Sequence, residues 1–282
     1  MNNNLSPLQI KLLDMLKWFH AFCEANHLRY YVIGGTLLGA ARHQGFIPWD
    51  DDIDIGMPRK DYNRLQQLLQ GKTGRYVLEY PGMRDDYFYP LSKLYDTTTT
   101  LIENTKCQIK RGIFLDIFPL DGLGNSLEEA QKNFSHLAWK LDLLLARTAG
   151  IRKGRSFFKN LAVYGARLIP NFMLSNQKLL QRIVQDCQKY DFDHYAFCAN
   201  TLGVARRKEI VPFVMFGKPT LYPFEDTYIY GVEQVDKYLS HIYGNWRKLP
   251  PQAKRITHHD FVALDLDQPY TIDQSGLSKG NK

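Results

Sequence analysis

The sequence predicts an α+β fold in which a mixed sheet is flanked by helices. Residues 29–57 alternate as strand, helix and strand, several strand-like runs follow as far as residue 121, and the pattern turns helical from Ser126. An α/β organisation remains the alternative for the first part of the chain. With 282 residues, the protein is long enough for one large domain or two modest ones.

The first helix has the clearest boundaries. Ser6 can cap it, Pro7 fits its first turn, and Gln9 completes a capping box. Apolar residues then recur at helical spacing along one face as far as Cys23. We expect this helix to end near Asn26.

The elements after it are predicted from periodicity and turn residues. We expect a strand at residues 29–33, a glycine turn at 34–36 and a short helix at 37–43. A second strand is expected at residues 52–57 and a helix at 59–70. Further strands are expected at residues 75–80, 87–96, 97–103 and 113–121. The chain is predicted to divide into a catalytic core at residues 1–125 and a helical subdomain at 126–195. A mixed C-terminal segment at residues 196–272 would complete the substrate site, and residues 273–282 would form a flexible tail.

Composition favours an intracellular protein with an anionic partner. Lys and Arg number 36 against 29 Asp and Glu, which gives a net charge of +7 and an isoelectric point near 9.1. Such a charge suits a nucleotide, a phosphorylated polymer or an anionic membrane surface. The N-terminus lacks a secretion signal, and no run of about 18 apolar residues occurs. We therefore predict a cytoplasmic location.

The four cysteines show no CxxC pair, so reduced thiols are expected. A zinc site made of Cys187, His194 and Cys198 is the disfavoured alternative.

The acidic stretch WDDDIDI is the strongest chemical signal, with carboxylates at Asp50, Asp51, Asp52 and Asp54. On a strand, Asp52 and Asp54 would project to the same face, roughly 6–7 Å apart, and repel each other. A divalent cation such as Mg²⁺, which prefers oxygen ligands, would neutralise them. The alternative is a solvated acidic turn that caps a helix.

Two neighbouring features favour the metal. Gly34, Gly35 and Thr36 can offer backbone N–H groups to a phosphate at the start of the following helix. Asp116 lies in the apolar stretch GIFLDIFPLD, where an unpaired carboxylate is costly. Asp121 competes as the third acid, although PLDG looks like a turn in which Asp is common.

These residues resemble the LicD family, which is related to fukutin within the nucleotidyltransferase superfamily. The similarity lies in GGTLLGAARHQGFIPWDDDIDI, in FLDIFPLD and in YLSHIYGNWRKLPPQAKR followed by HH, and it spans about residues 5–262. It implies a polymerase-beta-like nucleotidyltransferase core with Gly34, Gly35 and Thr36 in the phosphate-binding turn. It also implies that Asp52, Asp54 and Asp116 are the catalytic, metal-binding carboxylates.

The resemblance further implies a Mg²⁺-dependent transferase, with Mn²⁺ as an alternative metal. Such an enzyme moves phosphocholine from CDP-choline to a sugar hydroxyl of a cell-surface glycan, such as teichoic acid, lipopolysaccharide or a capsule precursor, and releases CMP. Relatives transfer ribitol phosphate or glycerol phosphate. Asp116 is the expected proton acceptor, while Arg42 and His43 are expected to meet the charge of the nucleotide.

Several weaker signals concern the substrate. A choline headgroup needs aromatic rings, for which the candidates are Trp49, Tyr87, Phe88, Tyr89 and Trp246. His258 and His259 are further candidates, against the alternative of a surface pair. The basic stretch at residues 147–159 suits donor phosphates, a charged acceptor or the inner membrane face, but equally a solvated loop.

Two other functions fit less well. A DxD glycosyltransferase would need a larger doubly wound sheet before the acids, whereas only one helix and one short strand precede them. An RNA-binding or RNA-modifying protein would need clustered Arg and Lys interleaved with exposed aromatics, and no such module is recognised. We therefore expect no nucleic-acid partner.

Overall fold

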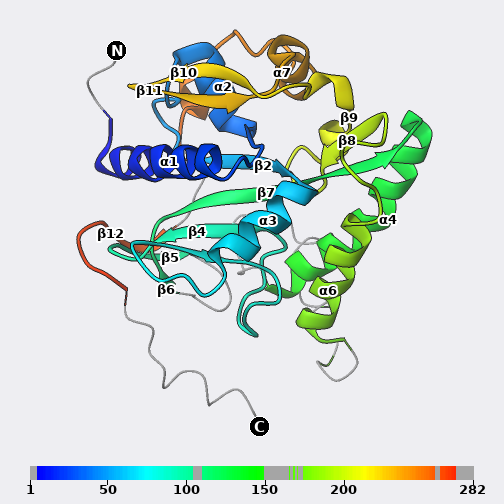
Figure 1. Ribbon diagram of the computed structural model, residues 1–282, viewed down its shortest axis with the longest axis horizontal. Coiled ribbons are helices and arrows are strands. Elements are labelled where there is room, and N and C mark those ends of the chain that lie inside the picture. The colour runs from blue at the N-terminus through cyan, green and yellow to red at the C-terminus, as the bar shows by residue number, and fades with distance from the viewer. Residues whose placement is uncertain are drawn as a thin grey trace.

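The computed structural model describes residues 5–103, 110–148, 174–257 and 261–270, together with the single residues 165, 168 and 170. A seven-stranded sheet lies at its centre, with helices around it (Figure 1). Its strands are β1 (Tyr31–Val32), β2 (Asp54–Pro58), β3 (Tyr76–Glu79), β4 (Ser92–Asp96), β7 (Phe114–Gly124), β8 (Phe197–Asn200) and β9 (Val211–Pro212).

The strand order is β1-β2-β7-β4-β3, with β8 beside β7 and β9 beside β8. Within the described part of this sheet, β2 and β7 run parallel and the other pairs run antiparallel. The predicted mixed sheet is therefore confirmed.

Two smaller sheets accompany the central one. A hairpin is formed by β10 (Thr220–Phe224) and β11 (Thr227–Gly231). The other small sheet has the order β12-β5-β6, built from β12 (Phe261–Asp265), β5 (Thr100–Glu103) and β6 (Lys110–Arg111).

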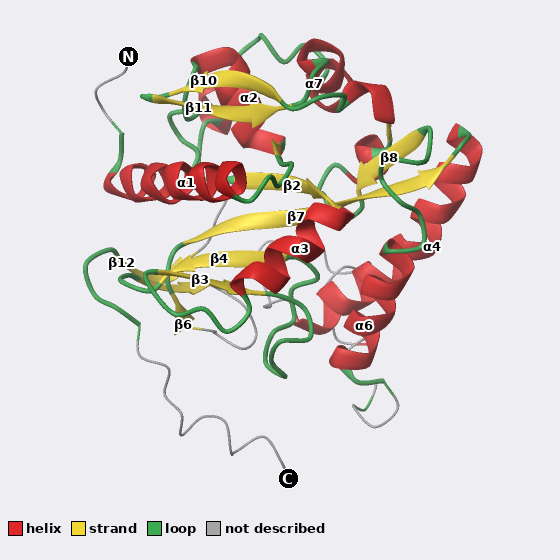
Figure 2. Ribbon diagram, in the orientation of Figure 1, coloured by secondary structure: helices red, strands yellow, loops and turns green. Residues whose placement is uncertain are grey.

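The α-helices of the described residues are α1 (Pro7–Ala25), α2 (Gly34–His43), α3 (Arg59–Leu69), α4 (Leu127–Thr148), α6 (Asn176–Cys187) and α7 (Val235–Tyr243). Figure 2 shows α4 and α6 side by side, away from α1 and α2. The β10–β11 hairpin contacts α2 and β1. The hairpin from the C-terminal third of the chain thus lies beside α2 and β1, which come from its N-terminal part.

The first helix forms as its sequence predicts. The Ser6 hydroxyl accepts the backbone N–H of Gln9, and the Gln9 side chain accepts the backbone N–H of Ser6, so the capping box is confirmed. Leu12, Leu16 and Phe19 are buried on the inner face. The C-cap is Asn26, as expected.

One continuous hydrophobic core runs from Leu12 to Trp246. It includes Phe216, Phe224 and Leu239, so the C-terminal third packs into the same core as the N-terminal residues. A smaller cluster joins α4 to α6. The division at residues 125, 195 and 272 remains a prediction.

Two predicted strands begin later than expected. The strand at residues 87–96 starts only at Ser92, and the one at residues 97–103 starts only at Thr100. A turn separates them because the Asp96 carboxylate accepts hydrogen bonds from the Thr98 backbone N–H (3.0 Å) and hydroxyl (2.7 Å). Such an Asp-centred turn competes with strand pairing.

Two predicted turns are wrong. Gly34, Gly35 and Thr36 form the first turn of α2, because the first helical hydrogen bond runs from the Leu37 N–H to the Ile33 carbonyl. Asp121 lies inside β7, where it pairs with Ala199 of β8. The sequence could not show the buried partner that makes an acid tolerable there.

Candidate active site

The parallel pair β2–β7 places acids from two separate chain segments side by side. Asp54 is the register partner of Asp116, and adjacent strands lie about 4.8 Å apart. The Asp116 N–H donates to the Ile53 carbonyl (3.0 Å), which fixes this register. The Asp54 N–H donates to the Thr36 hydroxyl (2.9 Å), which ties β2 to α2.

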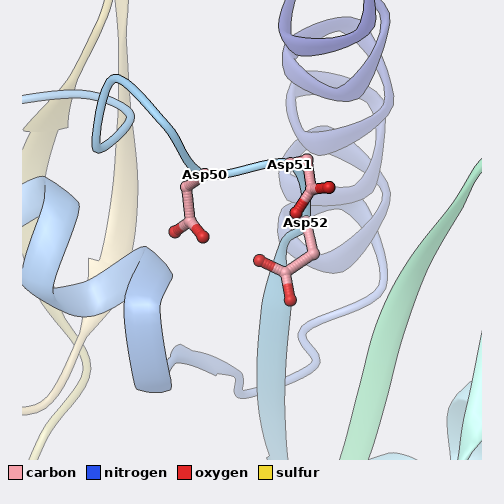
Figure 3. A group of neighbouring side chains, drawn as sticks. All are labelled: Asp50, Asp51 and Asp52. Atoms are coloured by element: carbon pink, nitrogen blue, oxygen red, sulfur yellow. The ribbon is translucent and has the colours of Figure 1, made fainter. Parts of the chain in front are cut away.

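Three more acids lie directly before β2. Ligand atoms of Asp50, Asp51 and Asp52 all lie within 4.8 Å of one another (Figure 3). The strand expected from Asp52 begins only at Asp54, so Asp52 lies just before β2, although its charge still acts on Asp54. Asp52 instead belongs to a loop that turns its carboxylate toward those of Asp50 and Asp51.

Gln9 of α1 holds this acidic loop in place. Its side-chain amide donates to the backbone carbonyl of Asp50 (2.9 Å) and to that of Ile47 (3.4 Å). Gln9 is only 3% exposed, although it is polar. The same side chain therefore completes the helix cap and positions the loop, a role that its place in the capping box did not reveal.

Negative charge is concentrated around Asp54. Burial raises the pKa of Asp54 well above its ordinary value, and the charges of Asp52, Asp116 and Asp50 raise it further. Burial likewise raises the pKa of Asp116, against the opposing effect of Lys93. The pKa values of both buried carboxyls are therefore shifted toward the protonated, neutral form.

Asp116 offers a test of whether the residues present fit a cation. Its Oδ1 is enclosed, and its close charged neighbour is the Lys93 ammonium at 3.0 Å, whose geometry is poor for a hydrogen bond. A buried carboxylate oxygen normally has a hydrogen-bond partner. The set of carboxylate oxygens fits a divalent cation such as Mg²⁺, which binds through oxygen ligands.

Two glycines let the first turn of α2 approach these acids. A Cβ at Gly34 would lie 2.7 Å from Asp54 Oδ2, and one at Gly35 would lie 2.8 Å from Asp50 Oδ2. Gly34 also has a φ of +57°, which side chains disfavour. The N-terminal end of α2 and the carboxylates thus form one continuous surface.

Sequence reasoning missed Lys93 and Glu103 behind Asp116, and it proposed Tyr89 only as a ring for choline. The Lys93 ammonium lies 3.6 Å from Glu103 Oε1 as well as near Asp116, and it sits over the Phe114 ring. The Tyr89 hydroxyl donates to Glu103 Oε2 (2.6 Å). The available signal was a lone lysine in the apolar stretch around SKLYD, since a buried lysine needs acidic partners.

Asp121, the competing third acid, has a different environment. Both of its oxygens accept hydrogen bonds from Arg59, at 2.7 and 2.5 Å, and Asp121 is fully buried. A bidentate arginine pair satisfies the carboxylate. Of the two candidates, Asp116 is therefore the one that borders the other acids.

Arg42 borders a pocket of about 530 Å³ whose aromatic lining is Trp49, Tyr243 and Trp246. Its Nη1 donates to the Trp246 carbonyl (2.7 Å), so α2 is tied to the segment after α7. Two of the predicted aromatic candidates, Trp49 and Trp246, thus share one pocket. We call it the tryptophan pocket.

The His43 ring contacts Arg42, whose Nε donates to His43 Nδ1 (3.4 Å), but it does not line the tryptophan pocket. It lines a separate pocket of about 520 Å³ with Glu225, Asp226 and Tyr228, at the C-terminal end of α2. The structure therefore does not bring Arg42 and His43 to one cavity. Tyr87 is 1% exposed and its hydroxyl donates to the Leu91 carbonyl, which leaves little of its ring for a ligand.

The remaining predicted features give no second site. Within the described ranges, the one group of side chains spaced so that it could hold a metal ion is Asp50, Asp51 and Asp52, so Cys187, His194 and Cys198 do not gather. Arg147 bonds the Asn176 side chain (2.7 Å). Cys107, His258, His259 and residues 149–159 lie outside the described residues.

Comparison with known proteins agrees with this geometry. A model described as LicD/FKTN/FKRP, nucleotidyltransferase domain, matches residues 27–139. The lipopolysaccharide cholinephosphotransferase LicD of Haemophilus influenzae is 31% identical over 262 residues, which are 90% of this chain and 96% of that protein. The chain belongs to the LicD family.

Other relatives of this LicD-family chain match shorter stretches. Human ribitol 5-phosphate transferase FKRP is 46% identical over 68 residues, 24% of this chain and 14% of that protein. Yeast mannosyltransferase regulator 4 is 28% identical over 121 residues, 41% of this chain and 10% of that protein. The family-model match includes Gly34, Asp54 and Asp116.

None of the helices among the described residues has the length and apolar character to cross a membrane.

Proposed function

We propose that this protein transfers phosphocholine, or a related phospho-alcohol, from a CDP-activated donor to a sugar hydroxyl of a cell-surface glycan and releases CMP. The match to a lipopolysaccharide cholinephosphotransferase along 90% of the chain supports this activity. The observation that carries it is the pairing of Asp54 with Asp116 beside the acidic loop and the first turn of α2. We propose a cytoplasmic location for the reaction, as the sequence predicts.

The proposal includes a polymerase-beta-like core and a divalent cation. Asp52, Asp54 and Asp116 would hold Mg²⁺, with Mn²⁺ as the alternative. Asp50 and Asp51 have ligand atoms within 4.8 Å of Asp52 and could replace or join it. When bound, the ion would supply positive charge that orients the pyrophosphate and stabilises the transition state. The enclosed Oδ1 of Asp116, which has a single poorly oriented contact with Lys93 among the described residues, supports this ligand set.

The remaining chemistry is assigned to the chain's own side chains and backbone. Gly34, Gly35 and Thr36 would present the N-terminal turn of α2 to the donor phosphates. The sugar oxygen bonds to the phosphorus that carries the alcohol, the bond to the CMP oxygen breaks, and CMP takes the electron pair. Asp116 would accept the sugar proton, and Lys93 would hold Asp116 in position.

Ribitol phosphate is the second candidate for the transferred group. The support is the 46% identity to human ribitol 5-phosphate transferase over 68 residues. This stretch is short, whereas the similarity to the cholinephosphotransferase spans 90% of this chain. Phosphocholine is therefore the first choice.

A donor screen tests the proposed function. Purified protein with Mg²⁺ and an acceptor glycan extract is incubated with CDP-choline, CDP-ribitol, CDP-glycerol or CDP-ethanolamine, and CMP release is measured. We expect release above background with CDP-choline, and its loss in Asp54→Asn. Turnover of UDP-sugars alone would instead show a glycosyltransferase.

A further inference from the structure

The tryptophan pocket, described above beside α2, has one sign of charge. Arg42, Lys248 and Lys254 line it, and no carboxylate does. Lys248 and Lys254 are exposed. Such a lining attracts an anion and repels a quaternary ammonium. The pocket therefore suits the phosphate-bearing nucleotide better than the choline headgroup, although it contains two of the rings proposed for choline.

The aromatic lining suits a flat base. Trp49 is partly buried and packs against the core from one side. The Arg255 guanidinium lies 5.6 Å from the centre of its ring, so this ring already accepts a planar, charged neighbour. Trp246 is 7% exposed and its ring is held in place, because its indole N–H donates to the Asp236 carboxylate (3.1 Å). Bases stack on such rings without needing a specific sequence.

The pocket adjoins the acids. Trp49 directly precedes Asp50, whose carboxylate lies against Gly35. Tyr243 lines the pocket, and 44% of this residue is exposed. Burial of its hydroxyl end raises the pKa of Tyr243, and the negative charge of Asp54 raises this pKa further. A ligand held in the pocket would therefore have its phosphate end within reach of the acidic loop.

We infer that the tryptophan pocket binds the CMP half of the donor, with the base against Trp49 and the phosphates between the pocket cations and the acids. The inference rests on the proposed function for the identity of the nucleotide. It assigns the choline end of the donor to a different part of the site. The volume of about 530 Å³ is within the range of ligand pockets.

Direct binding tests this assignment without turnover. CMP and choline chloride are titrated into the full-length protein in Mg²⁺ buffer, and binding is followed by calorimetry and tryptophan fluorescence. We expect CMP to bind and choline chloride not to displace it. Trp49→Ala should raise the Kd for CMP about 5- to 100-fold, and Lys248→Gln with Lys254→Gln should raise it about tenfold.

Matched controls separate the pocket from general effects. Trp139 is 54% exposed on α4, and Lys132 is exposed on the same helix. Trp139→Ala and Lys132→Gln should leave the Kd for CMP unchanged. If Trp49→Ala does not fold, the lysine pair, which lies on the surface, still decides the question.

The outcomes distinguish the two proposals. CMP binding that depends on Trp49 or the lysines, in a protein that turns over no CDP-alcohol, would support the pocket and refute the transferase. Turnover of CDP-choline with a Kd for CMP unaffected by both sets of changes would refute the pocket alone. Lysine-dependent binding of phosphatidylglycerol vesicles with no response to CMP would also overturn the assignment, by showing a membrane surface.

Discussion

Asp54 of β2 and Asp116 of β7 are direct partners in the parallel strand pair of the central sheet. They come from segments 62 residues apart in sequence, and the acidic loop at residues 50–52 lies next to them. Burial and mutual repulsion oppose ionisation of Asp54, and a bound cation would favour it. This relationship makes the site testable through stability as well as activity.

Asp54→Asn should abolish transfer and stabilise the metal-free protein. Because the folded-state pKa of Asp54 is raised above 3.8, its contribution to stability is present below that pH and is lost as pH rises through the raised value. At pH 7 Asp54 is ionised in the unfolded chain, so its raised folded-state pKa is a cost to folding that Asn removes. Thermal unfolding in EDTA should show a higher Tm for the variant.

Added Mg²⁺ should reverse this order. At 100 times its Kd, the ion should stabilise the wild-type protein by about 2.7 kcal/mol, and it should stabilise Asp54→Asn much less. Equal stabilisation of both proteins by Mg²⁺ would contradict the assignment of Asp54 as a ligand.

Gly34→Ala and Gly71→Ala form a matched pair. Both glycines have positive φ, +57° and +69°, so each substitution should cost about 1 kcal/mol of folding free energy through backbone strain. Only at Gly34 would the new Cβ lie 2.7 Å from Asp54, whereas nothing lies within 4 Å at Gly71. We expect chemical denaturation to show similar losses, and CMP release to fail only in Gly34→Ala. Loss of activity in both would point to folding rather than to the site.

Asp121→Asn should destabilise the protein without removing the chemistry. It leaves the buried Arg59 with an incomplete partner, which typically costs about 3–5 kcal/mol. Urea unfolding measures the loss, and assays well below the new Tm should retain CMP release. A folded but inactive Asp121→Asn protein would return Asp121 to the list of ligands.

Glu209 should make stability fall as pH rises. Burial raises the pKa of this carboxyl from 4.5 to about 7. Its contribution to stability is therefore present below pH 4.5 and is lost between pH 4.5 and about 7, at a total cost of about 3 kcal/mol above that range.

Glu209→Gln should flatten this pH dependence and raise the Tm at pH 8. The backbone N–H of Ala205, which now donates to Glu209 Oε1 (3.3 Å), can donate to the amide oxygen of Gln instead. Melting curves of both proteins from pH 4.5 to 8 show whether Glu209 causes the pH dependence of stability. Parallel pH profiles for the two proteins would show that Glu209 is not responsible.

The sequence by itself determined the elements whose signals are local. The capping box of Ser6 and Gln9 predicts α1 because both hydrogen bonds span only three residues. The acids at residues 50–54 and Asp116 were recognisable because carboxylates in apolar surroundings are costly. Family resemblance in the same stretches predicted the LicD family, which the comparisons confirmed.

Only the tertiary structure decided what depends on distant partners. It showed that Arg59 satisfies Asp121 inside a strand, that Lys93 lies beside Asp116, and that Gln9 holds the acidic loop. It also separated Arg42 from His43 into two pockets. Burial and charge pairing arise between segments that meet only in the folded chain, so residue spacing carries no record of them.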